Sequence, residues 1–339
     1  MENYIKICYA IIVAEEDMQK NRSGSAVAEH RKRRKRWTSR DFTLFFAACA
    51  GLLFLLIFSY IPMAGIIIAF KDDSQYFNIF EVIQYGSFVG FDNFIEFFRD
   101  QKFWDVIMNT LGLNLLMLLF NFPAPVIFAM LLNEIRHRRY KKTIQTLSIF
   151  PQFISWVVFG GIIIALADMT TGIVNPILYA LGIGSSDNPI NLLTAPYFWP
   201  LMIIISMIKG VGWGSVIYLA AITNISSELY EAAQLDGANR FQCAMHVTLP
   251  GIAPTITVFL LLNISNLLSN SFEQFYVLQN PANISRSEVL ATYIYQMGMI
   301  ERKYSYTTAM GLFESLVGIV LMLTANAISK KVADRGLFD

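Results

Sequence analysis

Long apolar runs alternate with short polar segments along most of this 339-residue chain. Six runs are long enough to cross a membrane, because a helix rises about 1.5 Å per residue and about twenty residues span the hydrocarbon core. They cover residues 42–70, 106–132, 144–167, 197–223, 252–270 and 308–328. This pattern predicts an all-α polytopic membrane protein with six transmembrane helices. Pro123 and Pro125 predict a kink in the second helix.

The distribution of charge predicts the orientation of these helices. Basic residues cluster at 30–36, at 136–142 and at 330–335, whereas 72–105 is mostly acidic and 169–196 has no Lys or Arg. Because cytoplasmic flanks carry the excess of Lys and Arg, both termini should be cytoplasmic. The basic run at 30–36 lies directly before a span, so we expect it to contact lipid headgroups and set the topology, with no role in nucleic-acid binding.

The predicted organisation has five parts. Residues 1–41 form a cytoplasmic N-terminal segment, 42–70 the first transmembrane helix and 71–105 an extracytoplasmic loop. Residues 106–328 form a core with five transmembrane helices and a polar loop at 224–251, and residues 329–339 form a cytoplasmic tail.

Composition and motifs argue against catalysis by this chain. Hydrophobic residues make up 55% and charged residues 15%, whereas soluble domains carry about 25% charged residues. The three cysteines and three histidines are scattered without metal-ligand spacing. The sequence contains no Walker phosphate loop, GxSxG or HExxH pattern. We therefore expect no catalytic residues, no cofactor and no metal site, and a role in moving a solute.

The loop at 224–251 is the most informative segment and contains the run EAAQLDGANRFQCAMHVTLP from Glu231 to Pro250. Ser227 can cap a short helix, and Glu231 lies near the positive end of its dipole. Ala232 and Ala233 leave one side of that helix without bulk, and Asp236-Gly237 is a turn signal. Asn239 to Thr248 predicts a second short helix that stops near Pro250.

This loop resembles the EAA loop of permease subunits in binding-protein-dependent ABC importers. The resemblance implies that the loop forms a coupling helix that docks into a cytoplasmic ATPase. The residues that it assigns to coupling are Glu231, Ala232, Ala233, Asp236, Gly237, Ala238, Leu249 and Pro250.

The resemblance extends over most of residues 90–339, to a branch of sugar-type permeases that includes importers of oligosaccharides released from alginate or rhamnogalacturonan. It implies the type I ABC importer fold in a bacterial cytoplasmic (inner) membrane. It also implies four kinds of partner: a second, different permease that completes a heterodimer, two ATPase subunits that bind ATP and Mg, an extracytoplasmic solute-binding protein and an oligosaccharide. An ion-coupled secondary carrier is the alternative, although we find no inverted repeat that would favour it.

Several polar residues inside the spans are candidates for a solute path. Lys209 should face the bundle interior, paired with Glu314 or Glu273, because a charge in the membrane centre is costly. A structural role for Lys209 is favoured over substrate contact. The glycines at 210, 212 and 214 indicate close helix packing.

One face of the fifth span carries amide side chains. Asn263, Asn266 and Asn270 recur at helical spacing, and Glu273 and Gln274 continue the line. Amide and carboxylate groups can replace hydrogen bonds between a sugar and water. The same residues could instead form hydrogen bonds between helices, and the sequence leaves both interpretations open.

Overall fold

The computed structural model describes residues 39–76, 78–269 and 271–333. These residues are largely helical and contain no β-strand, only two isolated bridges, Lys71 with Phe88 and Ser185 with Asn188. The chain divides into two compact units, residues 1–64 and 65–339. The basic run at 30–36 lies outside the described residues.

The described part of the first unit is a helix. α2 (Ser39–Leu55) continues through a π-turn, η1 (Leu56–Tyr60), into α3 (Ile61–Met63). Its apolar side chains are exposed along its length, including Phe46, Leu52 and Phe58. A helix that is apolar all round requires lipid or another protein around it. The candidate membrane span that overlaps this helix, Phe42–Phe70, has the predicted bounds.

Four helical stretches of the second unit are long and apolar enough to cross a membrane, counted over the described residues. They are Gln101–Glu134, Ala195–Thr223, Arg240–Ser265 and Tyr304–Lys331. They confirm the predicted second, fourth, fifth and sixth spans. The bounds of the fifth span differ: it covers Arg240–Ser265, whereas the predicted range was 252–270. After Ser265 the backbone N–H groups of Asn266, Leu267 and Ser269 donate to carbonyls three residues earlier, which is the pattern of a turn and not of an α-helix.

The second span is broken at the predicted kink. α6 (Gln101–Phe120) and α7 (Pro123–Glu134) are separated by a turn at Asn121 and Phe122. Pro123 lies in the first turn of α7, where its missing N–H loses no intrahelical bond. The dihedral angles of Asn121 and Phe122 stay helical, so the predicted kink is a short interruption of the α-helical hydrogen bonds.

The third predicted span is not a continuous helix. α8 (Arg138–Ile149) and the 3-10 turn η3 (Phe150–Phe153) meet α9 (Trp156–Ala167) at an angle of 101°. Pro151 cannot continue a helical ladder, and the Ser155 hydroxyl caps α9 by accepting from the Val158 N–H at 3.3 Å. The described chain therefore has five spans, or six if this bent pair crosses the membrane as one.

The helix after the polar loop does not stop at Pro250, contrary to the prediction. α13 (Arg240–Cys243), the π-turn η4 (Ala244–Thr248) and α14 (Leu249–Ser265) follow one another with helical dihedral angles at both junctions. In η4 the Leu249 N–H bonds to the Ala244 carbonyl, one residue farther back than in an α-helix. This wider turn accommodates the proline ring at the start of α14.

α11 (Ala195–Thr223) crosses very close to α8 within the second unit. A Cβ at Gly212 would overlap the Ser148 carbonyl, and a Cβ at Gly214 would lie 3.0 Å from Cγ of Pro125. Gly210 has nothing within 4 Å of the corresponding position. The predicted close packing is therefore confirmed at the second and third of the three glycines only.

Three clusters of buried apolar residues hold the second unit together. The first joins α5 (Asp92–Arg99), α6, α17 (Leu290–Tyr295) and α18 (Tyr304–Ala333), the second joins α6, α9, α11 and α15 (Phe272–Tyr276), and the third joins α7, α11 and α14. Central residues are Phe97, Phe103 and Met310 in the first cluster, Phe159, Phe198 and Phe275 in the second, and Ala129, Tyr218 and Ile252 in the third.

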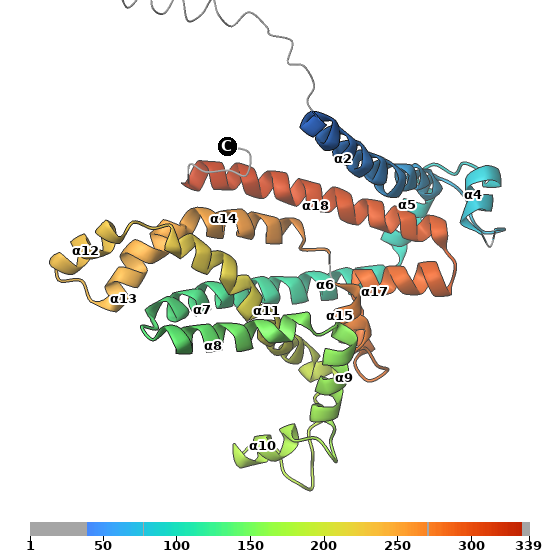
Figure 1. Cartoon of the computed structure of the whole chain (residues 1–339). Helices are drawn as coiled ribbons and strands as arrows, with labels where there is room; N and C mark the ends of the chain where they lie inside the picture. The colour runs from blue at the N-terminus through green and yellow to red at the C-terminus, as the bar shows by residue number, and fades with distance from the viewer. Residues whose placement is uncertain (1–38, 77, 270, 334–339) are drawn as a thin grey trace, which may run out of the picture. The chain divides into compact units, whose positions relative to one another are not determined.

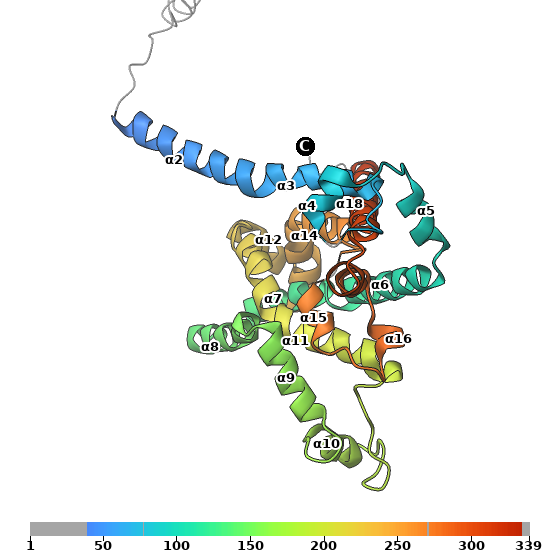
Figure 2. The same cartoon turned by 90° about the vertical axis from the view of Figure 1, so that its right-hand side faces the viewer.

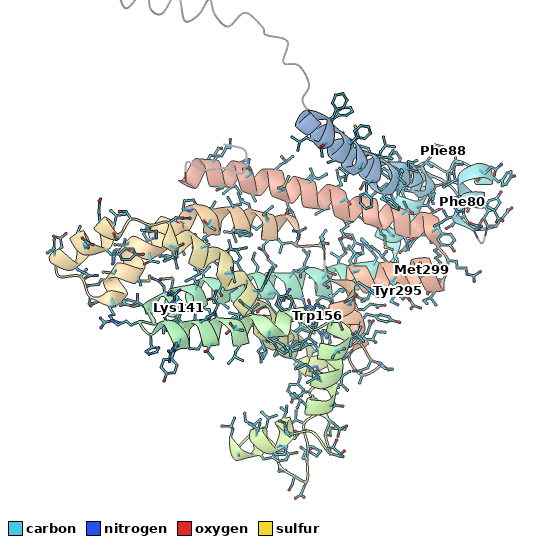
Figure 3. All side chains as sticks on the ribbon, viewed as in Figure 1. Phe80, Phe88, Lys141, Trp156, Tyr295 and Met299 are labelled. Carbon is cyan, nitrogen blue, oxygen red and sulfur yellow. The ribbon has the colours of Figure 1, made fainter. Side chains whose placement is uncertain are left out.

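The short helices of the second unit gather at different places. α12 (Ser227–Leu235) and α13 lie together at one end, and α9 leads away from the other helices to α10 (Val174–Ala180) (Figures 1 and 2). α4 (Ile79–Tyr85), α17 and η5 (Gln296–Ile300) lie at the end opposite α12, and α16 (Ile284–Ser287) precedes α17. Figure 3 places Lys141 at the α12 end and Phe80, Phe88 and Met299 at the opposite end. The segment predicted to be cytoplasmic thus shares an end with the polar loop.

Candidate coupling loop and polar cavity

The polar loop forms two short helices joined by a tight turn. Ser226, and not the expected Ser227, caps α12, and its hydroxyl accepts from the Glu228 N–H at 3.3 Å. Glu228 lies in the first turn of α12, and Glu231 lies one turn further along. Both carboxylates are therefore near the amino-terminal half of the helix, where its dipole favours negative charge.

Gly237 ends α12 in a left-handed conformation, with φ of +84°. The Ala238 N–H donates to the Ala233 carbonyl at 2.9 Å, and the Gly237 N–H donates to the Gln234 carbonyl at 3.1 Å. These two bonds are those of a Schellman helix terminus, which requires a residue with positive φ at this position. The predicted turn at Asp236-Gly237 is confirmed.

Side-chain hydrogen bonds that the sequence analysis did not predict hold the second half of the loop in place. Asn239 and Gln242 form a reciprocal capping box, with bonds of 2.9 and 2.8 Å between each side-chain oxygen and the other backbone N–H. The hydroxyls of Tyr230 and Thr248 lie 2.9 Å apart and connect α12 to η4. The spacing Asn-x-x-Gln was a sequence signal for this cap. The loop is thus a preformed unit.

This unit presents apolar side chains to its surroundings. Leu235 is 89% exposed at the end of α12, and Phe241 is 74% exposed on α13. Glu231 and Ala232 are exposed on α12, whereas Ala233 and Ala238 are half-buried. Leu235 and Phe241 are therefore exposed apolar side chains on an otherwise polar loop.

A cavity of about 510 Å³ lies between α6, α7, α11 and α14. Its polar lining consists of amides and hydroxyls, and its apolar lining includes several aromatic rings. The lining residues that carry these groups are Asn114, Asn121, Asn263, Asn266, Ser269, Phe122, Trp213, Tyr218 and Phe259. This volume is within the range of small-molecule pockets.

Two of the predicted path residues lie in this cavity, and their amide hydrogen bonds stay within their own helix. The Asn263 Nδ2 donates to the Phe259 carbonyl and the Asn266 Nδ2 to the Leu262 carbonyl, both at 2.8 Å. These bonds do not join helices, unlike the bond from Asn114 Nδ2 to the Leu267 carbonyl at 2.6 Å. Asn114 and Asn121 were not among the predicted residues, although their spacing of seven places both on one helix face.

The other residues of the predicted polar face separate from it. Asn266 follows the last residue of α14, and Glu273 lies on the separate helix α15. Gln274 donates to the Ser206 hydroxyl at 2.9 Å and therefore connects α15 to α11. Asn270 lies outside the described residues. The prediction of a single continuous helix face from residue 263 to residue 274 was therefore wrong.

Lys209 has a structural role, as the sequence predicts, but its hydrogen-bond partners are not the expected ones. Its ammonium group donates to the Pro151 carbonyl at 3.0 Å and to the Ile154 carbonyl, at the break between α8 and α9. It also lies 5.0 Å from the centre of the Trp156 ring, which Figure 3 shows at the start of α9. A broken helix leaves carbonyls without donors, and Lys209, only 4% exposed, supplies them. Pairing with Glu314 or Glu273 was wrong.

Glu314 lies on α18 and lines a second cavity of about 270 Å³ with Ser265, Asn266 and Ser269. Its carboxyl group shares a hydrogen bond with Ser269. Asn266 and Ser269 line both cavities, so the two are neighbours.

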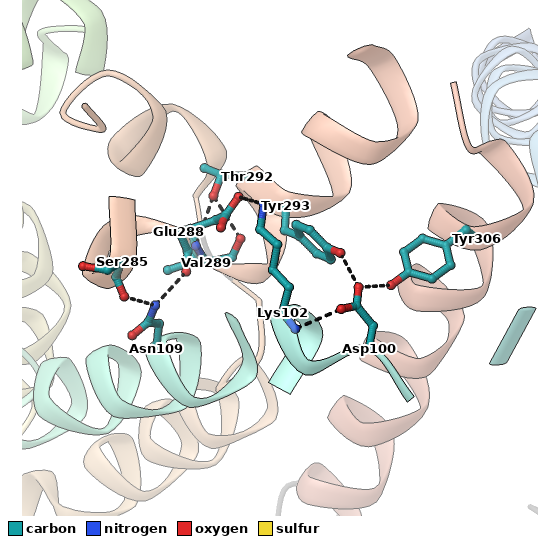
Figure 4. Close-up of polar contacts among 9 residues, drawn as sticks. All are labelled: Asp100, Lys102, Asn109, Ser285, Glu288, Val289, Thr292, Tyr293 and Tyr306. Atoms are coloured by element: carbon teal, nitrogen blue, oxygen red, sulfur yellow. Dashed lines mark hydrogen bonds and ion pairs between the residues drawn. The ribbon is translucent and has the colours of Figure 1, made fainter. Parts of the chain in front are cut away.

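A polar cluster ties helices together at the end opposite α12. Figure 4 shows Asp100 between Tyr293 and Tyr306, whose hydroxyls donate to Asp100 Oδ2 at 2.8 and 3.1 Å. Lys102 bonds to Asp100 through its N–H and forms an ion pair of 3.3 Å with Glu288. Burial alone raises the pKa of Asp100, but these hydrogen bonds and the Lys102 charge outweigh it and lower the pKa from its ordinary 3.8. No pattern in the sequence predicts this cluster.

Comparison with known proteins identifies the family. Residues 122–334 match the model of the binding-protein-dependent transport system inner membrane component. The chain belongs to this family. Protein LplB of Bacillus subtilis (strain 168) is 43% identical over 300 residues, which cover 88% of this chain and 92% of LplB. The polygalacturonan/rhamnogalacturonan transport system permease protein YteP of the same organism is 38% identical over 295 residues, covering 87% and 90%.

Solved structures agree with the assignment of this chain to the family. A chain in the crystal structure of a bacterial alginate ABC transporter in complex with alginate pentasaccharide-bound periplasmic protein superposes with a TM-score of 0.78. It is 36% identical, and the match covers 88% of this chain and 97% of that one. The predicted fold, an all-α ABC importer permease, is confirmed. The family consists of membrane permease subunits that are not themselves enzymes. Within the described residues, no group of three His, Cys, Asp or Glu side chains could hold a metal ion.

Proposed function

We propose that this permease subunit forms half of a translocation path for an oligosaccharide and couples that path to a cytoplasmic ATPase through α12. The proposed partners are a second permease, two ATPase subunits that bind ATP and Mg, and an extracytoplasmic solute-binding protein. The relatives named for polygalacturonan/rhamnogalacturonan and alginate support an oligosaccharide as the solute.

The geometry of the loop is the observation that carries this proposal. The Schellman turn at Gly237 and the capping box at Asn239 hold α12 and α13 in one arrangement. Within it, Leu235 projects from the end of α12. A rigid helix with an exposed apolar tip can transmit the movement of a docked protein, because little of that movement is lost in the loop.

The cavity supports the proposed translocation path for an oligosaccharide. Sugars combine hydroxyl groups with apolar ring faces. Amide side chains such as Asn263 can replace water at the hydroxyls, and aromatic rings such as Trp213, which is 51% exposed, can stack on the ring faces. The partner permease would supply the opposite wall.

The orientation follows from the two ends of the second unit. Lys141 and the last turn of α18, with its two lysines, lie at the end that carries α12. An excess of Lys and Arg favours the cytoplasmic side. We therefore place α12 and α13 in the cytoplasm, where the ATPase is, and α4 and α5 outside.

The experiment is uptake by proteoliposomes that contain the chain, its partner permease and the ATPase, with the binding protein outside. Uptake of an oligosaccharide should require internal ATP and the binding protein, and it should persist when ion gradients are collapsed. Uptake that follows an ion gradient without ATP would identify a secondary carrier and overturn the proposal.

The coupling role of α12 is tested with Leu235→Ala. Truncation of an apolar side chain at the centre of an interface costs about 1 kcal/mol or more, or about fivefold in association. Leu235→Ala should therefore weaken co-purification of the ATPase. Leu181→Ala, at another exposed leucine next to α10, is the matched control and should bind the ATPase like the parent. Equal binding by both variants would remove Leu235 from the interface.

A further inference from the structure

The two neighbouring cavities form one polar seam along the second unit. The larger lies between α6, α7, α11 and α14, and the smaller continues from it toward α18. Asn266 and Ser269 belong to the lining of both. Glu314 lies in the smaller cavity, at the side of α18 that faces these two residues. A solute that contacts the asparagines of the larger cavity is therefore next to the Glu314 carboxyl group.

The described part of the seam carries no basic side chain. Among the described residues that line either cavity there is no Lys or Arg, and Glu314 is the charged side chain of the set. Lys209, the cation within α11, is held by two backbone carbonyls and lies over the rings of Trp156 and Phe159, 5.0 and 5.2 Å from their centres. Its ammonium group is thus committed to the break between α8 and α9.

A lining with one carboxyl group and no basic side chain among its described residues favours a neutral oligosaccharide over an anionic one. A polyuronate carries one carboxylate on each sugar unit. A carboxylate that leaves water needs a cation or several hydrogen-bond donors to offset its lost hydration. The described lining has no cation, the amides of Asn114, Asn263 and Asn266 already donate to backbone carbonyls, and an ionised Glu314 would repel the carboxylates. Neutral hydroxyl groups suffer neither penalty, because amides and the carboxyl group can hydrogen-bond to them.

We infer that this permease carries an uncharged oligosaccharide, and that Glu314 disfavours polyuronates of the kind named for its relatives. This inference rests on the proposed function, since it concerns the solute of that same path. It assigns to Glu314 a role in specificity through its charge.

The test uses cells that express the complete transporter, including the partner permease, the ATPase and the binding protein. They receive oligogalacturonides together with the same oligosaccharides after reduction of each carboxyl group to a primary alcohol, plus digests of arabinan and galactan. Internalised sugars are measured by mass spectrometry. We expect uncharged oligosaccharides to accumulate and oligogalacturonides to be excluded. Accumulation of oligogalacturonides at the rate of their reduced counterparts would overturn the inference while supporting the proposed function. Uptake of none of these sugars would count against the proposed function itself.

Variants separate Glu314 from the rest of the path. Glu314→Lys should raise the uptake of oligogalacturonide relative to its reduced counterpart by about tenfold, which corresponds to about 1.4 kcal/mol. Glu314→Gln should raise the ratio less, because it removes repulsion without adding attraction. Glu301→Lys, the same change at an exposed ion pair outside the seam, is the matched control and should leave the ratio unchanged. An unchanged ratio in Glu314→Lys that still imports neutral sugar would exclude Glu314 from selection, and equal ratios in both lysine variants would mean that net charge alone acts.

Discussion

Replacing Gly237 by valine tests the coupling loop at the point where its geometry is most demanding. The residue has φ of +84°, and the bonds from Gly237 and Ala238 to the carbonyls of Gln234 and Ala233 depend on that conformation. A β-branched side chain disfavours positive φ strongly. We expect the variant either to hold the turn under strain or to give it up.

Holding the turn under strain and giving it up cost a similar free energy. Strain at a left-handed position is about 1–3 kcal/mol. Loss of the two Schellman bonds, each worth about 0.5–1.5 kcal/mol, amounts to a similar value. A Cβ at this position has nothing within 4 Å, so collision adds nothing. A penalty of about 2 kcal/mol lowers the equilibrium ratio of native to non-native loop by about thirtyfold.

The assay combines co-purification of the ATPase with the ratio of ATP hydrolysed to solute imported in proteoliposomes. Gly237→Val should insert into the membrane normally but bind the ATPase weakly, or hydrolyse ATP without proportionate uptake. Gly237→Asn is the matched control, because asparagine tolerates the left-handed region, and it should stay close to the parent.

Two results would refute this reasoning. A valine variant that binds, hydrolyses and imports like the parent would show that the loop does not need this turn. An asparagine variant as impaired as the valine variant would show that any side chain is excluded there, so that backbone strain is not the cause.

Four further predictions follow from other parts of the molecule. An impermeant maleimide should label Ser74→Cys but not His137→Cys in intact cells with a Cys-free background, and the reverse pattern would invert the topology. Asn263→Leu should reduce uptake about fivefold, the value of one hydrogen bond, and leave assembly intact, because its amide bonds only to its own helix; loss of assembly would make it structural. Lys209→Met should lower the unfolding free energy by about 1–3 kcal/mol, since two buried carbonyls lose their donor, and a parent-like thermal melt in detergent would contradict this. Asp100→Asn should be less stable than the parent at about pH 7, and the gap should begin to close below the unfolded pKa of 3.8, because the stability that comes from the lowered pKa of Asp100 is lost as pH falls through the folded pKa; a gap that is constant with pH would exclude the carboxylate as its source.

The sequence by itself determined the features that depend on local pattern. Apolar length was enough for most of the spans, because the requirement for about twenty apolar residues comes from the membrane and not from the fold. Pro123 located the break in the second span, and Gly237 located the turn of the coupling loop, since both residues restrict or free the backbone in place. The family could be recognised from the loop for the same reason.

Only the tertiary structure decided which polar residues meet. Lys209 finds its partners at the bend of a helix some 55 to 58 positions earlier in the chain, and no spacing along α11 indicates that. Asn114 and Asn121 join Asn263 and Asn266 around one cavity because α6, α7 and α14 all contact α11. Pro250 continues a helix because the π-turn before it widens the backbone. Periodicity reports which face of a helix a residue occupies, but the partner of that face is set by packing between segments far apart in sequence.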